Sequence, residues 1–114
     1  MRDGTKIAVD IHLPGFDDNG EKFSAILILT PYDRRFALRK RHRPDIDPCP
    51  TVAFDRDTFV PRGYALVAVD IRGSGASFGC RDGLRSPNER LDHFDITDWL
   101  ANQPWSTGLI GATG

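Results

Sequence analysis

The sequence predicts an α/β fold, with a mixed, mostly parallel sheet and flanking helices. Apolar runs of strand length and segments of helical period follow one another as strand, strand, helix, strand, helix, strand. Residues 65–69 are the clearest case, because they have no polar alternation and therefore fit a strand buried on both faces. The run ends at Asp70, and a turn rich in glycine and serine follows over residues 71–79.

The length and composition are typical of one small globular domain. Hydrophobic residues make 39% and charged residues 27% of the 114 residues, which is ordinary for a soluble domain. The net charge of −1 points to neither nucleic acid nor a membrane surface, so neither is expected as a partner. No apolar leader is visible at the N-terminus, which slightly favours the cytoplasm and leaves the compartment open. The cysteines, Cys49 and Cys80, are expected to be free thiols.

Two strands are expected in the first part of the chain. Residues 5–13 alternate in part, with Ile7, Val9 and Ile11 on one face, as in a half-buried strand near an edge. Residues 23–30 form a continuous apolar run that predicts an inner strand, which Pro31 ends.

A basic, proline-rich excursion is expected over residues 34–51. Its arginines and single lysine are typical of a solvated loop, although such a run could also bind phosphate. Pro44, Pro48 and Pro50 should prevent regular structure there. Long excursions of this kind are often lids or binding loops.

Helical signals flank the central strand. Residues 52–60 suggest a short helix, with Gly63 as a left-handed C-cap. Ser86-Pro87-Asn88-Glu89 is a capping box that starts a second helix.

The second helix should bury one face and end before a final strand. Ile96, Trp99 and Leu100 share a face at the helical period. A turn is expected at Thr107-Gly108, followed by a strand from residue 109 that runs into Gly114. No helix follows this strand, so the fold is expected to be incomplete at this end.

Two segments are site candidates because they follow predicted parallel strands, whose carboxyl ends carry the sites in open α/β sheets. Tyr32, in the first segment, could donate a phenolic hydrogen bond into a cleft or could pack under a loop. Residues 70–79 could form a rim next to a site or a plain tight turn. The residues alone are compatible with both interpretations of each segment.

Five stretches in order carry a family resemblance. They are residues 1–7, 29–33 (Leu-Thr-Pro-Tyr-Asp), 59–64, 70–79 (Asp-Ile-Arg-Gly-Ser-Gly-Ala-Ser-Phe-Gly) and 98–114. Together they resemble the α/β-hydrolases of the X-Pro dipeptidyl-peptidase type, serine hydrolases that include cocaine esterase and α-amino-acid ester hydrolases. The resemblance implies that residues 1–114 are the N-terminal portion of one catalytic domain with an α/β-hydrolase fold.

The resemblance also implies roles for particular residues. Gly114 aligns with the first glycine of the G-x-S-x-G nucleophile elbow, so the nucleophile, the acid and the histidine would lie beyond Gly114. Tyr32 matches the tyrosine that donates its hydroxyl to the family's oxyanion hole. Asp70, Arg72, Gly73 and Gly75 would shape the rim without taking part in chemistry, and Ser74 and Ser77 lack the elbow spacing.

The expected function is hydrolysis of a small ester, amide or X-Pro-type peptide, with no triad chemistry from these 114 residues alone. The alternative is a non-catalytic nucleotide- or anion-binding module. However, the sequence has no G-x-x-x-x-G-K-[ST] motif, and the glycines from Gly73 onward do not have the G-x-G-x-x-G spacing. No cofactor is expected, nor a metal, because His12, His42 and His93 show no ligand spacing. With its last strand unpaired on one side, the isolated chain is expected to self-associate.

Overall fold

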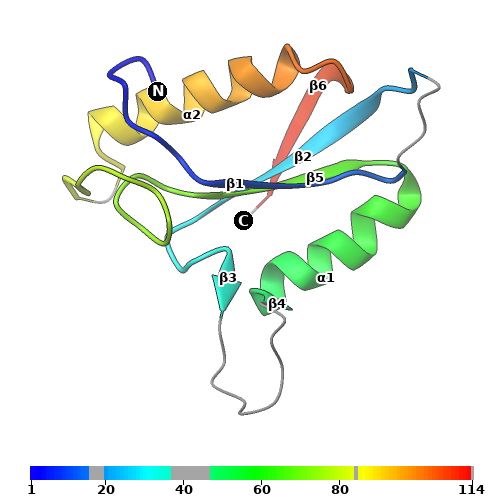
Figure 1. The fold of residues 1–114 in the computed structure, drawn as a ribbon, viewed down its shortest axis with the longest axis horizontal. Coiled ribbons are helices and arrows are strands. Elements are labelled where there is room, and N and C mark those ends of the chain that lie inside the picture. Colours follow the sequence, from blue (N-terminus) through cyan, green and yellow to red (C-terminus); the bar gives the residue numbers. More distant parts are fainter. Residues whose placement is uncertain (16–19, 37–46, 84, 114) are drawn as a thin grey trace.

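A four-stranded sheet lies between two helices in the computed structural model, which describes residues 1–15, 20–36, 47–83 and 85–113 (Figure 1). The strand order is β1-β5-β2-β6, with β1 antiparallel to β5 and with β5, β2 and β6 parallel. The main elements are β1 (Val9–His12), β2 (Phe23–Thr30), α1 (Pro50–Phe59), β5 (Ala65–Asp70), α2 (Pro87–Ala101) and β6 (Ser106–Thr113). The predicted element order and the mixed, mostly parallel sheet are confirmed.

The two helices cover opposite faces of the sheet, and β5 contributes to both cores (Figure 1). Ile96 and Leu100 of α2 share one cluster with the odd-numbered residues of β5. Val52 of α1 shares the other cluster with Leu66 and Ala68. All six residues of β5 are buried, which confirms the strand predicted from its continuous apolar run.

The first strand is at an edge of the sheet, as predicted, but it is short. Only Val9–His12 is strand, and Ile11 is exposed although the alternation placed it on the buried face. The residues before it run along α2 instead, where the backbone N–H of Arg2 donates to the Asp95 carboxylate at 2.8 Å. Closer to β1, the chain bonds to the segment after β5, because the N–H of Phe78 donates to the carbonyl of Lys6 at 2.9 Å.

The ends of the basic excursion are more regular than expected. Strand β3 (Arg35–Phe36) pairs antiparallel with β4 (Asp47–Pro48), and Pro50 is the first residue of α1. The expectation that Pro48 and Pro50 prevent regular structure is therefore wrong. Pro48 is tolerated because a two-residue strand pair forms without its N–H. Pro50 is tolerated because the N–H groups of a first helical turn have no partner within the helix. Residues 37–46, which hold most of the basic run, lie outside the described residues.

The predicted start of α2 is confirmed, and Gly63 is left-handed as predicted, although it ends the 3₁₀ turn that follows α1 rather than α1 itself. After α1, the 3₁₀ turn η1 (Val60–Arg62) ends at Gly63, whose φ of 86° is left-handed. The Ser86 hydroxyl accepts a hydrogen bond from the backbone N–H of Glu89 at 3.2 Å at the start of α2. Neither helix is both long and apolar enough to cross a membrane, and this holds for every helix within the described ranges.

The last strand begins earlier than predicted. Thr107-Gly108 is not a turn but part of β6, and the pairing of β6 with β2 shifts register between Phe23 and Ala25. Gly108 has a φ of 85°, so the glycine marks a β-bulge within the strand. Strand β6 pairs with β2 on one side and, within the described residues, with no strand on the other.

Replacing Leu100 by Ala tests the packing of α2 on the sheet. Leu100 is fully buried, so Leu100→Ala should lower the free energy of unfolding by about 2–5 kcal/mol. Leu91→Ala is the control on the same helix, because Leu91 is 42% exposed and its loss should be well below that. Urea unfolding followed by circular dichroism measures both, and equal losses would contradict this packing.

Candidate active site at the carboxyl edge of the sheet

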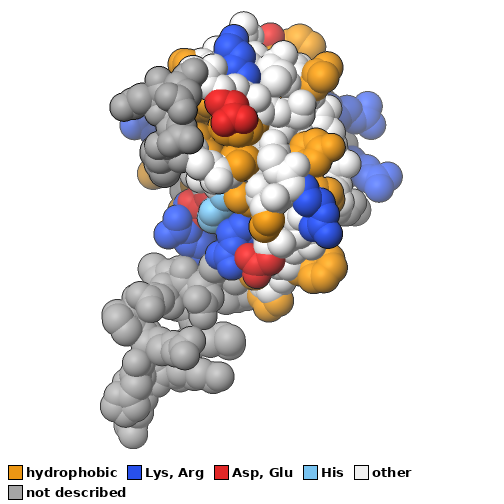
Figure 2. Space-filling view, turned by 90° about the vertical axis from the view of Figure 1, so that its right-hand side faces the viewer, with side chains coloured by type: hydrophobic (Ala, Val, Ile, Leu, Met, Phe, Trp, Pro, Cys, Tyr) orange, Lys and Arg blue, Asp and Glu red, His pale blue; other side chains and the backbone are white. Residues whose placement is uncertain are grey.

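The two site segments predicted from the sequence lie side by side. Thr30 and Asp70 are register partners at the ends of the parallel strands β2 and β5, and the N–H of Ile71 donates to the carbonyl of Thr30 at 3.2 Å. Residues 31–36 and 71–79 therefore leave the sheet at the same edge, which is where open α/β sheets place their sites. The opposite edge, where these strands begin, shows hydrophobic side chains and charges of both signs interspersed (Figure 2).

Asp70 joins the two segments. Its side chain is buried, and Oδ1 accepts the backbone N–H of Arg34 at 2.7 Å. Oδ2 accepts the backbone N–H of Ala76 at 3.0 Å and the guanidinium of Arg34 at 2.5 Å. A buried carboxylate is tolerated when it is paired and hydrogen-bonded in this way, so Asp70 fixes both loops to the central strand.

The glycines of residues 70–79 allow this arrangement. Gly75 has a φ of 51°, and a Cβ there would overlap the carboxylate of Asp70. Gly73 has a φ of 69°, and a Cβ there would lie 2.8 Å from the backbone nitrogen of Arg81. Both positions require glycine because the backbone is left-handed and the neighbours are close.

The hydroxyls of the two serines in this loop form hydrogen bonds with backbone groups. The hydroxyl of Ser77 donates to the carbonyl of Asp70 at 2.6 Å and accepts the N–H of Ala8 at 2.9 Å. The hydroxyl of Ser74 donates to the carbonyl of Ile71 at 2.8 Å. These bonds give both hydroxyls a structural role, in line with the expectation that neither is a nucleophile.

Arg72 anchors the loop to α2 and to the N-terminal segment. Its guanidinium donates to both oxygens of Asp92, at 2.8 and 2.6 Å, and to Asp3 at 2.6 Å. The hydrogen bond to Asp92, followed by that to Asp3, raises the pKa of Arg72, and the bond from Arg72 lowers the pKa of Asp3.

Asp92 is a residue whose role the sequence reasoning missed. Only 4% of it is exposed, although a carboxylate near a helix start needs no partner beyond the helix dipole to be favourable there. The available signal was its spacing, because Asp92 lies four residues before Ile96 and eight before Leu100, on the buried face. A carboxylate on such a face implies a buried cationic partner.

Tyr32 presents its side chain to solvent at the same edge. It is 76% exposed, which contradicts the alternative of a tyrosine packed under a loop within the described part of the chain. Its backbone N–H donates to the hydroxyl of Thr30 at 3.0 Å. Among residues 1–15, 20–36, 47–83 and 85–113, the Tyr32 hydroxyl has no hydrogen-bond partner, so it can donate to a bound molecule.

A second ion-pair group supports the loop after β2. Asp10 of β1 accepts from Arg35 at 2.6 and 2.8 Å and lies 3.1 Å from the guanidinium of Arg34. Burial by itself would raise the pKa of Asp10, but the hydrogen bond from Arg35 and the charges of both arginines outweigh it and lower that pKa. Arg34 thus links Asp70 of β5 to Asp10 of β1.

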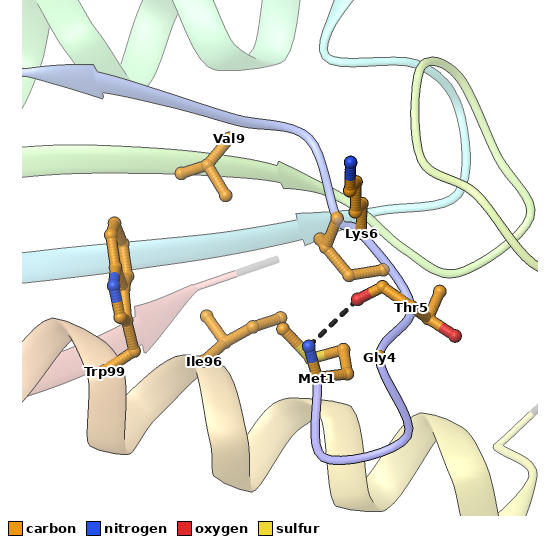
Figure 3. Close-up of a pocket in the computed structure, with 8 residues that line it drawn as sticks. Met1, Gly4, Thr5, Lys6, Val9, Ile96 and Trp99 are labelled. Carbon is orange, nitrogen blue, oxygen red and sulfur yellow. Dashed lines mark hydrogen bonds between the residues drawn. The ribbon is translucent and has the colours of Figure 1, made fainter.

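The other candidate features do not form a catalytic group. A hollow of about 530 Å³ between the N-terminal segment and α2 has a largely apolar lining that includes Met1, Val9, Ile96 and Trp99 (Figure 3). In the ranges that the structure describes, no three His, Cys, Asp or Glu side chains are grouped to hold a metal. His93 is exposed on α2, and Gly114 lies outside the described residues.

The sheet, its helices and the loops at its carboxyl edge define this chain as part of an α/β-hydrolase. It superposes on a CocE/NonD family hydrolase from Staphylococcus aureus with a TM-score of 0.70 and 28% identity, covering all of this chain and 21% of that one. An α-amino acid ester hydrolase gives a TM-score of 0.68 and 29% identity, with 19% of that chain covered. The predicted fold class is confirmed.

Residues 3–114 match the model of the X-Pro dipeptidyl-peptidase (S15) family, and the chain belongs to this family. It is 31% identical over 114 residues to cocaine esterase of Rhodococcus sp. and 43% identical over 119 residues to a candidate serine esterase of Mycobacterium bovis. Both alignments include the whole chain, which spans about a fifth of the length of these relatives. The resemblance seen in the sequence is confirmed.

Gly75→Ala should loosen this edge more than a comparable change elsewhere. Gly63→Ala is the control, since Gly63 is also left-handed but has open space around it, and it should cost about 1–2 kcal/mol of unfolding free energy. Gly75→Ala should exceed that cost by about 1–3 kcal/mol, because its Cβ must displace the Asp70 carboxylate. Urea unfolding of both variants measures the difference, and equal costs would contradict the close approach to Asp70.

The lowered pKa of Asp10 predicts a loss of stability in acid. A carboxyl whose pKa is lowered on folding stabilises the protein above its unfolded pKa, and this contribution is lost as the pH falls through the folded value. The free energy of unfolding should therefore fall as the pH drops below about 4, and Asp10→Asn should make that fall shallower. Urea titrations at several acidic pH values measure the slope, and an unchanged slope in the variant would contradict this role for Asp10.

Proposed function

We propose that this chain supplies the N-terminal strands and one oxyanion-hole donor to a longer serine hydrolase, which cleaves small esters or X-Pro-type amides through an acyl-enzyme. The observation that carries the proposal is the exposed side chain of Tyr32, with its hydroxyl available at the carboxyl edge of the sheet. The family match and the esterase names of the relatives support the reaction class.

The pairing of β6 with β2 supports the position of the nucleophile. Thr113 is the register partner of Ile28 in a parallel pair, so the position two residues after Thr113 is level with Thr30. The serine of a G-x-S-x-G elbow that begins at position 114 would come one residue later, level with residue 31. Neighbouring strands lie about 4.8 Å apart, so this serine would emerge beside Tyr32.

The chemistry follows from this placement. As the serine Oγ attacks the carbonyl carbon of the ester or amide, the hydroxyl proton passes to the histidine expected beyond position 114, and the carbonyl π electrons move onto the oxygen. The Tyr32 hydroxyl donates a hydrogen bond to that oxyanion, which carries more charge in the transition state than the ground-state carbonyl does. Collapse of the intermediate breaks the bond to the leaving group, which takes the proton back from that histidine and departs as an alcohol or amine. Water then hydrolyses the acyl-enzyme that remains.

The alternative of a phosphate-binding module is less consistent with the loop after β5. A phosphate cradle needs backbone N–H groups that point outward from the loop. Here the N–H groups of Gly73, Ser74 and Ser77 donate to carbonyls within the loop. The N–H of Ala76 donates to the Asp70 carboxylate, whose negative charge would repel a phosphate.

Tyr32→Phe in the full-length protein tests the proposal. It removes one oxyanion donor, so kcat for an ester such as p-nitrophenyl acetate should fall by about 10²–10³-fold with little change in KM. Tyr64→Phe is the matched control, because Tyr64 precedes the amino end of β5 and its ring packs edge-on against Phe59. An unchanged kcat in Tyr32→Phe would exclude the oxyanion role.

A further inference from the structure

We propose that Asp70 is a positioning residue for the reaction, because it fixes the turn at residues 31–34 and thereby the direction of the Tyr32 hydroxyl. This inference rests on the proposed function of Tyr32. It concerns how the donor is held in place, and it assigns Asp70 no contact with the substrate.

The turn needs such a support because the tyrosine itself has little. Tyr32 is 76% exposed, so side-chain packing within the described residues does little to orient it. The next residue, Asp33, has a φ of 62°, a left-handed conformation that is unfavourable for a residue other than glycine. A backbone in this conformation persists when its surroundings hold it there.

Two hydrogen bonds hold the turn, one on each side of the strained residue. Before it, the N–H of Tyr32 donates to the hydroxyl of Thr30 at 3.0 Å. After it, the N–H of Arg34 donates to Oδ1 of Asp70 at 2.7 Å. The second bond is charge-assisted and therefore the stronger of the two.

Asp70 is itself held firmly enough to act as a support. It is 1% exposed and lies at the end of β5, a strand paired on both sides. The Ala76 N–H donates to its second oxygen at 3.0 Å, and Gly75 packs directly against the carboxylate. The carboxylate has little room to move, so the turn attached to it is also restricted.

Arg34 completes the support. Its guanidinium lies 2.5 Å from Asp70 and 3.1 Å from Asp10, and 14% of its side chain is exposed. The turn is thus attached through Arg34 to both β5 and β1. The positive charge also compensates the burial of the Asp70 carboxylate, which would be unfavourable if it stood alone.

The test is Asp70→Asn in the full-length protein. The asparagine amide is nearly isosteric with the carboxylate, but its NH₂ group cannot accept a hydrogen bond. At least one of the hydrogen bonds to Asp70 is therefore lost, and the turn at residues 31–34 should loosen. A misplaced catalytic donor should lower kcat by between about 10-fold and 10²-fold, with KM changed little. The matched control is Asp92→Asn, which breaks a similarly buried ion pair with Arg72 but leaves this turn intact, and its kcat should stay near the wild-type value.

A double-mutant cycle with Tyr32→Phe separates positioning from general stability. If Asp70 acts through the tyrosine hydroxyl, Asp70→Asn should lower kcat in the wild type and cause little further loss in the Tyr32→Phe background. Equal losses in both backgrounds, or an equal loss in Asp92→Asn, would overturn the inference while leaving the oxyanion role intact. A Tyr32→Phe variant with full activity would overturn both proposals.

Arg34→Lys keeps the inference testable if Asp70→Asn does not fold. Lysine retains the positive charge and the backbone N–H, but it loses the geometry that joins Asp70 and Asp10. Its kcat should fall below the wild-type value, again with little further loss in the Tyr32→Phe background. Equal loss in both backgrounds would overturn the inference in this case too.

Discussion

The structure of the carboxyl edge depends on one buried carboxylate. Asp70 ends the central strand, and its two oxygens accept two backbone N–H groups and one guanidinium. Because a buried charge without partners is strongly unfavourable, the loops that supply these donors must come to Asp70 and stay there. Gly75 is a consequence of the same constraint, since no larger residue fits beside the carboxylate. The shape of the edge thus follows from satisfying one charge.

A second constraint of the same kind holds the loop on its other side. Arg72, two residues after Asp70, turns toward α2 and pairs with the buried Asp92. The loop after β5 is therefore held by its carboxylate toward β2 and by its arginine toward α2. In between, Ser77 bridges the carbonyl of Asp70 and the N–H of Ala8. In the proposed oxyanion hole, the backbone beside Tyr32 is held by the bond from Arg34 to Asp70 rather than by this second anchor.

Much of the framework could be predicted from local patterns. The continuous apolar runs located β2 and β5, and the capping box located the start of α2, because burial and capping are dictated by residues close in sequence. Local patterns were misleading at Thr107-Gly108, where a bulge looks like a turn, and at Pro48, where a two-residue strand tolerates a missing donor. In both places the pairing strand, rather than the local residues, decided the conformation.

The sequence by itself determined the fold class, the family and the candidate status of Tyr32 and Asp70, since motifs and strand ends are readable along one chain. The tertiary structure alone decided which charges meet. Arg34 and Asp70 are 36 positions apart, and Arg72 and Asp92 are 20 apart, so no local spacing could pair them. The choice of partner depends on which loops the parallel strands bring to one edge, and on the free energy required to bury each carboxylate there.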